Sequence, residues 1–133
     1  MFGKNNLSTD LSNEAELHDN SIDSRVADEK AFMMNAVWFK GRQGESRYRD
    51  YLRKMSPLIK KVGGRKLKSF VPERSLIGEL DADLIFFLEY PSWQAFKQFA
   101  NSPEYHKIAY IREEALDKQI LIRCGRPGRS FWG

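Results

Sequence analysis

Cysteine and histidine are scarce in this sequence. It contains one cysteine, Cys124, and two histidines, His18 and His106. A single cysteine excludes an internal disulfide and a cysteine-rich zinc site, and it suits a reducing compartment. With so few nitrogen and sulfur ligands, a transition-metal site built by the protein is not expected, and we predict no metal and no other cofactor.

Long hydrophobic runs are also missing. No apolar stretch approaches the roughly 18–20 residues that a membrane-spanning helix needs, and the N-terminus lacks the basic, then apolar pattern of a secretory signal. The sequence therefore predicts a cytoplasmic protein without a membrane partner. Phosphate-binding glycine loops, Gly-x-Ser-x-Gly motifs and metal-spaced histidine pairs are absent as well.

The length and the charge distribution predict one folded domain with a tail at each end. The chain has 133 residues, of which 41% are hydrophobic. Residues 1–35 carry seven acidic and three basic groups, a net charge of −4, whereas the whole chain has a net charge of +4. Because residues 1–30 also have few large apolar side chains, we predict a flexible acidic arm over 1–32, a folded domain over 33–125 and a basic tail over 126–133. Translation could instead begin at Met33 or Met34.

Hydrophobic spacing and turn residues predict the secondary structure of the domain. Strands are predicted at 34–40, 65–71, 84–90 and 119–124, with a further short strand at 76–80. Helices are predicted at 45–62, 93–100 and 103–116, where apolar residues recur every three or four positions. Ser92 and Ser102 are suited to cap the last two helices, and Pro103 fits a first helical position.

This order of elements is that of a ferredoxin-like β-α-β-β-α-β fold of the α+β class. Right-handed crossovers place the strands in one antiparallel sheet of order 4-1-3-2, with the helices on one face. Residues 84–90 are apolar at both alternating sets of positions, which is typical of a central strand covered on both sides. Since helices cover one face, we expect a second copy of the chain to cover the other, in a homodimer burying at least ~800 Å² per protomer.

Several short motifs point to a family. They are Tyr48 and Tyr51, Pro57 before Gly63-Gly64-Arg65, the stretches Leu88-Glu89-Tyr90-Pro91-Ser92 and Asn101-Ser102-Pro103-Glu104-Tyr105, and Arg112. Through them the stretch 34–124 resembles the bacterial family known as domain of unknown function 1330, within the dimeric α/β-barrel superfamily. Ala100 departs from the family pattern, which often has an aromatic residue there, and the arm and the tail lie outside the family domain. The resemblance implies a fold and a dimer but no activity, because this superfamily includes cofactor-free monooxygenases, muconolactone-type isomerases and haem-dependent enzymes.

Glu89 is the candidate catalytic base. It ends an otherwise apolar strand, on the same face as Ile85 and Phe87, where burial would raise the pKa of its carboxyl group and suit it to general-base catalysis. A structural role is the alternative, in which Glu89 forms an ion pair with Arg65 or Arg112 or reaches solvent at the end of the strand.

Other candidate site residues lie on the helices and at the start of a strand. Tyr48, Tyr51 and Tyr105 could line a pocket between helices and sheet and offer hydroxyl groups to a ligand, although aromatic residues at helical spacing are often simply core. Arg65 and Arg112 could bind a carboxylate, or they could be a surface residue and an ion-pair partner. His106 is a candidate base or haem ligand, beside the buried stripe, and Cys124 is expected to be a small core residue.

The basic run from Arg42 to Lys68 raises the possibility of nucleic-acid binding. It is divided between the solvent face of a helix and the outer positions of an edge strand, and no groove-reading motif accompanies it, so we expect a solvated surface rather than a nucleic-acid partner. We predict a small-molecule-binding protein, in one form a cofactor-independent enzyme that acts on a small carbonyl or anionic compound. The alternative is a non-catalytic dimeric module that binds a ligand or a partner.

Overall fold

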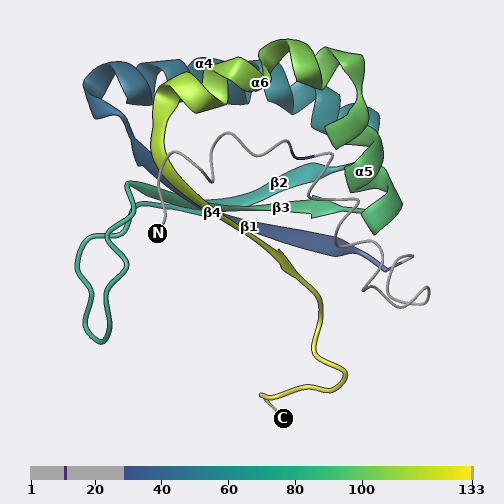
Figure 1. Ribbon diagram of the computed structural model, residues 1–133. Helices are drawn as coiled ribbons and strands as arrows, with labels where there is room; N and C mark the ends of the chain where they lie inside the picture. The colour runs from purple at the N-terminus through teal and green to yellow at the C-terminus, as the bar shows by residue number, and fades with distance from the viewer. Residues whose placement is uncertain (1–10, 12–28, 133) are drawn as a thin grey trace.

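The computed structural model describes Leu11 and residues 29–132, which form a sheet covered by helices (Figure 1). The elements in chain order are β1 (Ala31–Phe39), α4 (Gly41–Lys61), β2 (Arg65–Phe70), β3 (Leu84–Tyr90), α5 (Trp93–Asn101), α6 (Pro103–Ala115) and β4 (Leu116–Cys124). Apart from Leu11 and the residues from Glu29 onward, the predicted acidic arm lies outside the described residues. β1 begins at Ala31, so the last two residues assigned to the arm belong to the sheet.

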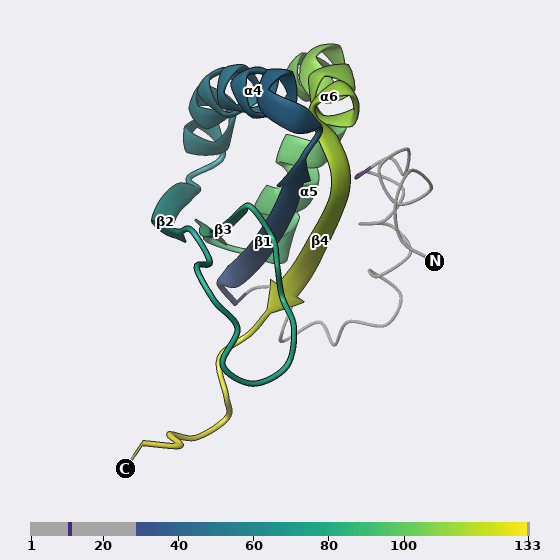
Figure 2. The same ribbon diagram turned by 90° about the vertical axis from the view of Figure 1, so that its left-hand side faces the viewer.

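The sheet has four strands in the order β2-β3-β1-β4, and every neighbouring pair is antiparallel. This is the predicted order 4-1-3-2 read from the opposite edge. β3 lies between β2 and β1, which makes it an interior strand, and α4, α5 and α6 lie together over one face of the sheet (Figures 1 and 2). The α+β ferredoxin-like prediction is confirmed.

Two serine caps position α5 and α6. The side-chain oxygen of Ser92 accepts a hydrogen bond from the Ala95 amide at 3.0 Å, and that of Ser102 accepts from the Tyr105 amide at 3.1 Å, with Pro103 in the first turn. These bonds satisfy amide groups that a helix start leaves without partners, and they fix where each helix begins. None of the helices in the described part of the chain is long and apolar enough to cross a membrane.

Residues 71–83 form an extended loop, and the short strand predicted at 76–80 is wrong. Leu76 and Ile77 are exposed, and Gly78 has a φ of +72°, a left-handed conformation that interrupts an extended strand. The strand was predicted from apolar composition alone. Both edges of β3 are already paired, one with β2 and the other with β1, so this segment cannot pair with β3.

The two faces of the sheet differ in what covers them. Phe86, Leu88 and Tyr90 of β3 face the helices and are buried. The alternate side chains form an outer face, on the side away from the helices, which no described helix covers. By strand register it comprises Phe32, Met34 and Trp38 of β1, Phe70 of β2, Ile85 and Phe87 of β3, and Ile120 and Ile122 of β4. β3 is thus apolar on both sides, as predicted.

α4 approaches the end of α6 at Gly44. The Lys40 amide donates to the Ala115 carbonyl at 2.9 Å, and a Cβ atom built on Gly44 would lie 2.5 Å from the same carbonyl oxygen. A backbone atom cannot move aside as a flexible side chain can, so only glycine allows this close approach.

We therefore expect Gly44→Ala to lower the free energy of unfolding by about 1–3 kcal/mol, the usual cost of overpacking a tight site. Urea denaturation followed by circular dichroism measures it. Gly125→Ala is the matched control because nothing lies within 4 Å of its added Cβ atom, and it should stay within about 0.5 kcal/mol of wild type. Equal effects from the two substitutions would contradict the packing described here.

Candidate ligand pocket

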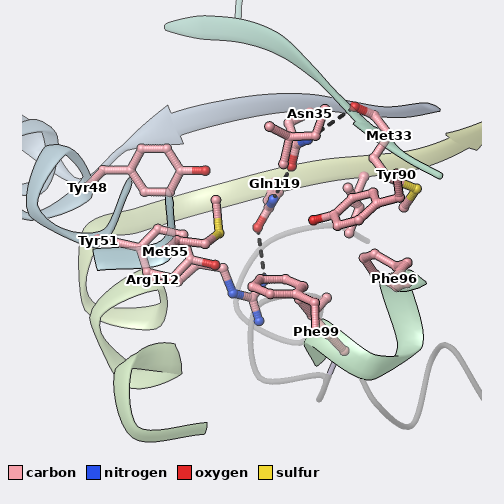
Figure 3. A pocket seen from close by; sticks show the side chains of 13 residues that line it. Met33, Asn35, Tyr48, Tyr51, Met55, Tyr90, Phe96, Phe99, Arg112 and Gln119 are labelled. Carbon is pink, nitrogen blue, oxygen red and sulfur yellow. Dashed lines mark hydrogen bonds between the residues drawn. The ribbon is translucent and has the colours of Figure 1, made fainter. Parts of the chain in front are cut away.

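A small pocket lies between the helices and the inner face of the sheet (Figure 3). Its lining comes from β1, β3 and β4 below and from α4, α5 and α6 above, and Leu11 also borders it. The cavity volume is about 20 Å³, which is room for about one water molecule. A larger occupant therefore has to displace side chains, and Met33 and Met55 in the lining are flexible enough to move.

A chain of polar side chains crosses this pocket. Nη1 of Arg112 donates to Oε1 of Gln119 at 2.8 Å, and Nε2 of Gln119 donates to Oδ1 of Asn35 at 3.0 Å. Asn35 in turn donates to the Met33 carbonyl at 3.4 Å. Arg112 is only 5% exposed, so a guanidinium charge sits inside a mainly apolar enclosure. Buried charges are costly, which makes Arg112 a candidate functional residue of the pocket.

Tyr48 and Tyr90 point their hydroxyl groups into the pocket from opposite sides, toward Gln119 (Figure 3). Both residues are 1% exposed, and neither hydroxyl forms a hydrogen bond to another of the described residues. Burial raises the pKa of both hydroxyls far above the ordinary 10.0, and it outweighs the opposing effect of Arg112 on Tyr48. At neutral pH these groups are therefore uncharged hydrogen-bond donors.

The two remaining predicted tyrosines bond to each other. The hydroxyl oxygens of Tyr51 and Tyr105 are 2.9 Å apart, and the rings of Tyr48 and Tyr51 stack with centroids 5.4 Å apart. Burial is again the main cause of a raised pKa for Tyr51. Tyr51 lines the pocket, whereas Tyr105 lies behind it and holds the Tyr51 hydroxyl in place.

Glu89 and Arg65 lie on the other side of the sheet. Leu88 and Tyr90 face the pocket, so Glu89 between them points to the outer face. Nε of Arg65 donates to Oε2 of Glu89 at 3.0 Å, and Nη2 of Arg65 donates to Oε1 of Glu89 at 3.4 Å. Nζ of Lys30 lies 3.7 Å from Oε2 of Glu89. The predicted rise in the Glu89 pKa is wrong: the hydrogen bond from Arg65 outweighs desolvation and lowers the pKa below its ordinary value.

The structure therefore separates the predicted site residues. Tyr48, Tyr51 and Arg112 come together in the pocket, and Tyr105 supports them. The ion-pair alternative for Glu89 describes its position, with Arg65 rather than Arg112 as the partner. His106 is exposed on α6 and does not line the pocket.

Asn35, Tyr90 and Gln119 are pocket residues that sequence reasoning missed. Asn35 had a detectable signal, because asparagine is disfavoured within strands and this one falls at an inward position between Met33 and Val37. Tyr90 is the last residue of β3, and Gln119 is the first residue of the strand predicted at 119–124, although β4 itself begins at Leu116. Polar side chains are common at strand ends and carry no such signal.

The basic face of α4 is largely neutralised by nearby acids. Arg49 pairs with Glu45 at 2.8 Å, Lys54 with Asp50 at 3.0 Å and Lys61 with Glu104 at 3.1 Å. Arg47 also pairs with Glu114. Cations that are already paired attract phosphate groups weakly.

Comparison with known proteins gives one family and several structures. The family model described as domain of unknown function (DUF1330) matches residues 36–125. A crystal structure of a protein of unknown function from Rhodopseudomonas palustris is similar at 26% identity and a TM-score of 0.74, covering 87% of this chain and 94% of that one. No curated protein matches the chain.

Two more distant structures share the fold. A DABB family protein with a ferredoxin-like fold from Mesorhizobium loti has 14% identity and a TM-score of 0.53, covering 74% of this chain and 98% of its own. SnoaB, a cofactor-independent oxygenase from Streptomyces nogalater, has 9% identity and a TM-score of 0.52, covering 77% of this chain and 99% of its own. At such identities the likeness concerns the fold alone.

The ion pair of Glu89 predicts an acid-sensitive contribution to stability. Because the folded-state pKa of Glu89 lies below the ordinary 4.5, the pair stabilises the fold above pH 4.5, and this contribution disappears as pH falls through the folded-state pKa. We expect Glu89→Gln to lower the free energy of unfolding at pH 7, and the difference from wild type to shrink below pH 4.5. Urea denaturation at a series of pH values measures this. Glu113→Gln, at an exposed position of α6, is the control. A difference that grows toward acid pH would overturn the assignment.

Proposed function

This chain belongs to the family described as domain of unknown function (DUF1330), and on that premise we propose that it binds a small anionic molecule, a carboxylate with an apolar body, in the pocket between helices and sheet. One observation carries the proposal. The hydroxyl groups of Tyr48 and Tyr90 are buried, point into a cavity and make no hydrogen bond to another described residue, beside the buried guanidinium of Arg112.

The two hydroxyls favour a ligand that accepts hydrogen bonds. A buried donor without a partner costs about 1–3 kcal/mol, so a fold that keeps two of them at one cavity gains from any occupant with acceptor oxygens. The water molecule that the cavity has room for can serve in the ligand's absence. A carboxylate or a carbonyl group supplies such acceptors, and it replaces that water on binding.

Arg112 favours a negative charge on that ligand. A guanidinium presents its N–H groups in a planar fork that matches a carboxylate, and its attraction for an anion is stronger in the apolar interior than in water. Leu88, Phe96 and Phe99 line the pocket and supply apolar contact for the rest of the molecule. Pockets of this kind, mainly apolar with a few converging polar groups, are typical of small-molecule sites.

Any chemistry in this pocket would rest on hydrogen-bond donors rather than on a carboxylate base. None of the described lining residues is acidic, and Glu89 belongs to the outer face. Two neutral tyrosines and an arginine stabilise negative charge that develops on a carbonyl oxygen, which is the role of an oxyanion site. The likeness to SnoaB supports small-molecule use of this fold and nothing about the reaction, because identity is 9%.

The chain is also proposed to be a homodimer that associates through the outer face. That face presents eight large apolar side chains, and no described helix covers it. Phe70 is 55% and Ile122 is 46% exposed, and the other six are half-buried. Monomeric proteins rarely leave so extended an apolar surface in water. A second copy related by a twofold axis brings the same face against itself and covers both.

Removal of the pocket hydroxyls should separate ligand binding from stability. We expect benzoate at millimolar concentration to raise the melting temperature of the wild type by mass action, and benzamide, its neutral analogue, to raise it less. Tyr48→Phe and Tyr90→Phe should each reduce the benzoate shift while the free energy of unfolding without benzoate stays within about 1 kcal/mol of wild type or rises, since each removes a buried donor without a partner among the described residues.

Two further variants serve as controls for this experiment. Tyr110→Phe changes an exposed hydroxyl and should leave the benzoate shift intact. Tyr51→Phe removes a buried hydroxyl that has a partner, so it should lower stability by about 0.5–1.5 kcal/mol. If salicylate, phenylacetate and hexanoate join benzoate in giving no shift, or if Tyr48→Phe and Tyr90→Phe preserve the shift in full, the pocket does not bind carboxylates.

A charge on the outer face should split the dimer. Sedimentation velocity is expected to give a dimer for the wild type at micromolar concentration and a monomer for Ile122→Asp, because an isologous interface buries the introduced carboxylate twice. Tyr110→Asp is the matched control, since Tyr110 is a similarly exposed apolar residue on the helix layer. A monomeric wild type, or loss of the dimer in Tyr110→Asp alone, would refute the outer face as the interface.

A further inference from the structure

Two segments project from the sheet on the side of the outer face. In both views the loop of residues 71–83 and the tail after β4 extend away from the helices (Figures 1 and 2). Each carries large apolar side chains in solvent: Leu76 is 88% and Ile77 is 97% exposed on the loop, and Phe131 is 77% and Trp132 is 100% exposed on the tail. Apolar groups held out in this way mark an interaction surface.

The tail is continuous with the outer face. The guanidinium of Arg126 lies over the ring of Phe32, 5.4 Å from its centroid, and Phe32 is one of the outer-face side chains. The tail also lies beyond the residues that the family model matches, which end at 125. Its aromatic and basic residues therefore lie outside the matched family domain, beside the proposed interface.

The loop and the tail have opposite charges. The loop carries Glu73, Glu79, Asp81 and Asp83 against one base, a net charge of −3, and the tail carries Arg126 and Arg129. Within the described residues none of the four loop acids forms an ion pair. Asp81 accepts a hydrogen bond from Nε1 of Trp38 at 2.9 Å and Asp83 accepts one from the Phe39 amide at 2.7 Å, so Glu73 and Glu79 are the acids open to a partner. Across an interface, a loop facing a loop or a tail facing a tail would bring like charges together, whereas a loop facing a tail brings opposite ones together.

We propose that the tail of one protomer packs against the loop of a second copy of this chain, so that two such contacts clamp the dimer. The inference rests on the proposed dimer through the outer face. Segments that extend past the plane of a face-to-face interface reach the partner, and twofold symmetry produces each contact twice. Leu76 and Ile77 would receive Phe131 and Trp132, and the arginines of the tail would meet Glu73 and Glu79 of the loop.

The test measures the dimer dissociation constant of full-length variants by sedimentation. Phe131→Ser with Trp132→Ser, and separately Leu76→Ser with Ile77→Ser, should each weaken the dimer at least about tenfold, and the combined variant should be little weaker than either, because both pairs belong to one contact. Tyr110→Ser, which removes an exposed aromatic group from α6, should leave the dissociation constant unchanged.

A charge exchange identifies the partner segment. Arg126→Glu with Arg129→Glu should weaken the dimer at low salt, and the addition of Glu73→Lys with Glu79→Lys should restore it. A wild-type dimer whose dissociation constant is unaffected by the loop and tail variants refutes the clamp and leaves the dimer standing. Weakening without restoration by the loop lysines refutes the pairing of tail with loop, and a monomeric wild type refutes the dimer itself.

Discussion

The structure depends on a strand that has to be covered twice. β3 directs Phe86, Leu88 and Tyr90 to one side and Ile85 and Phe87 to the other. Full burial of a large apolar side chain gains about 1.5–3 kcal/mol, and Ile85 and Phe87, which are half-buried, keep part of that gain for a further cover. The helices cover the first side and create a core. The second side belongs to the outer face, which no described helix covers. We therefore assign the outer face and the segments beside it to association with a second copy.

The helices that cover one side of the sheet also enclose the pocket, and polar groups inside it are shielded from water. Arg112, Gln119 and Asn35 form a hydrogen-bonded chain inside that layer, where hydrophobic residues would have packed at less cost. Real proteins break local rules of this kind at functional sites. Tyr48 and Tyr90 break another, since each keeps a buried hydroxyl that a phenylalanine would lack. Both departures occur at the same small cavity, which supports the assignment of ligand binding to it.

Sequence reasoning succeeded where local patterns decide the outcome. The apolar run at 84–90, the serine caps at 92 and 102, and the strand order follow from alternation, capping and chirality. It failed where distant residues decide. Alternation put Glu89 on the face of Ile85 and Phe87, but only the pairing of β2 with β3 brings Arg65 beside it and lowers its pKa. Likewise, the helical spacing of Tyr48 and Tyr51 predicted them as pocket residues. Tyr90 and Gln119 lie beside them only because the fold brings β3 and β4 under α4.

We assign separate roles to the two faces of one sheet, with a ligand beneath the helices and a partner on the other side. Adjacent methionines report on this directly, because Met33 faces the pocket and Met34 the outer face, with Met55 a second pocket probe. In a methionine-methyl NMR spectrum, benzoate should shift the signals of Met33 and Met55 and leave Met34 in place, while dilution to monomer should shift Met34 alone. A Met34 signal that ignores dilution, or one that follows benzoate together with Met33, would contradict the account.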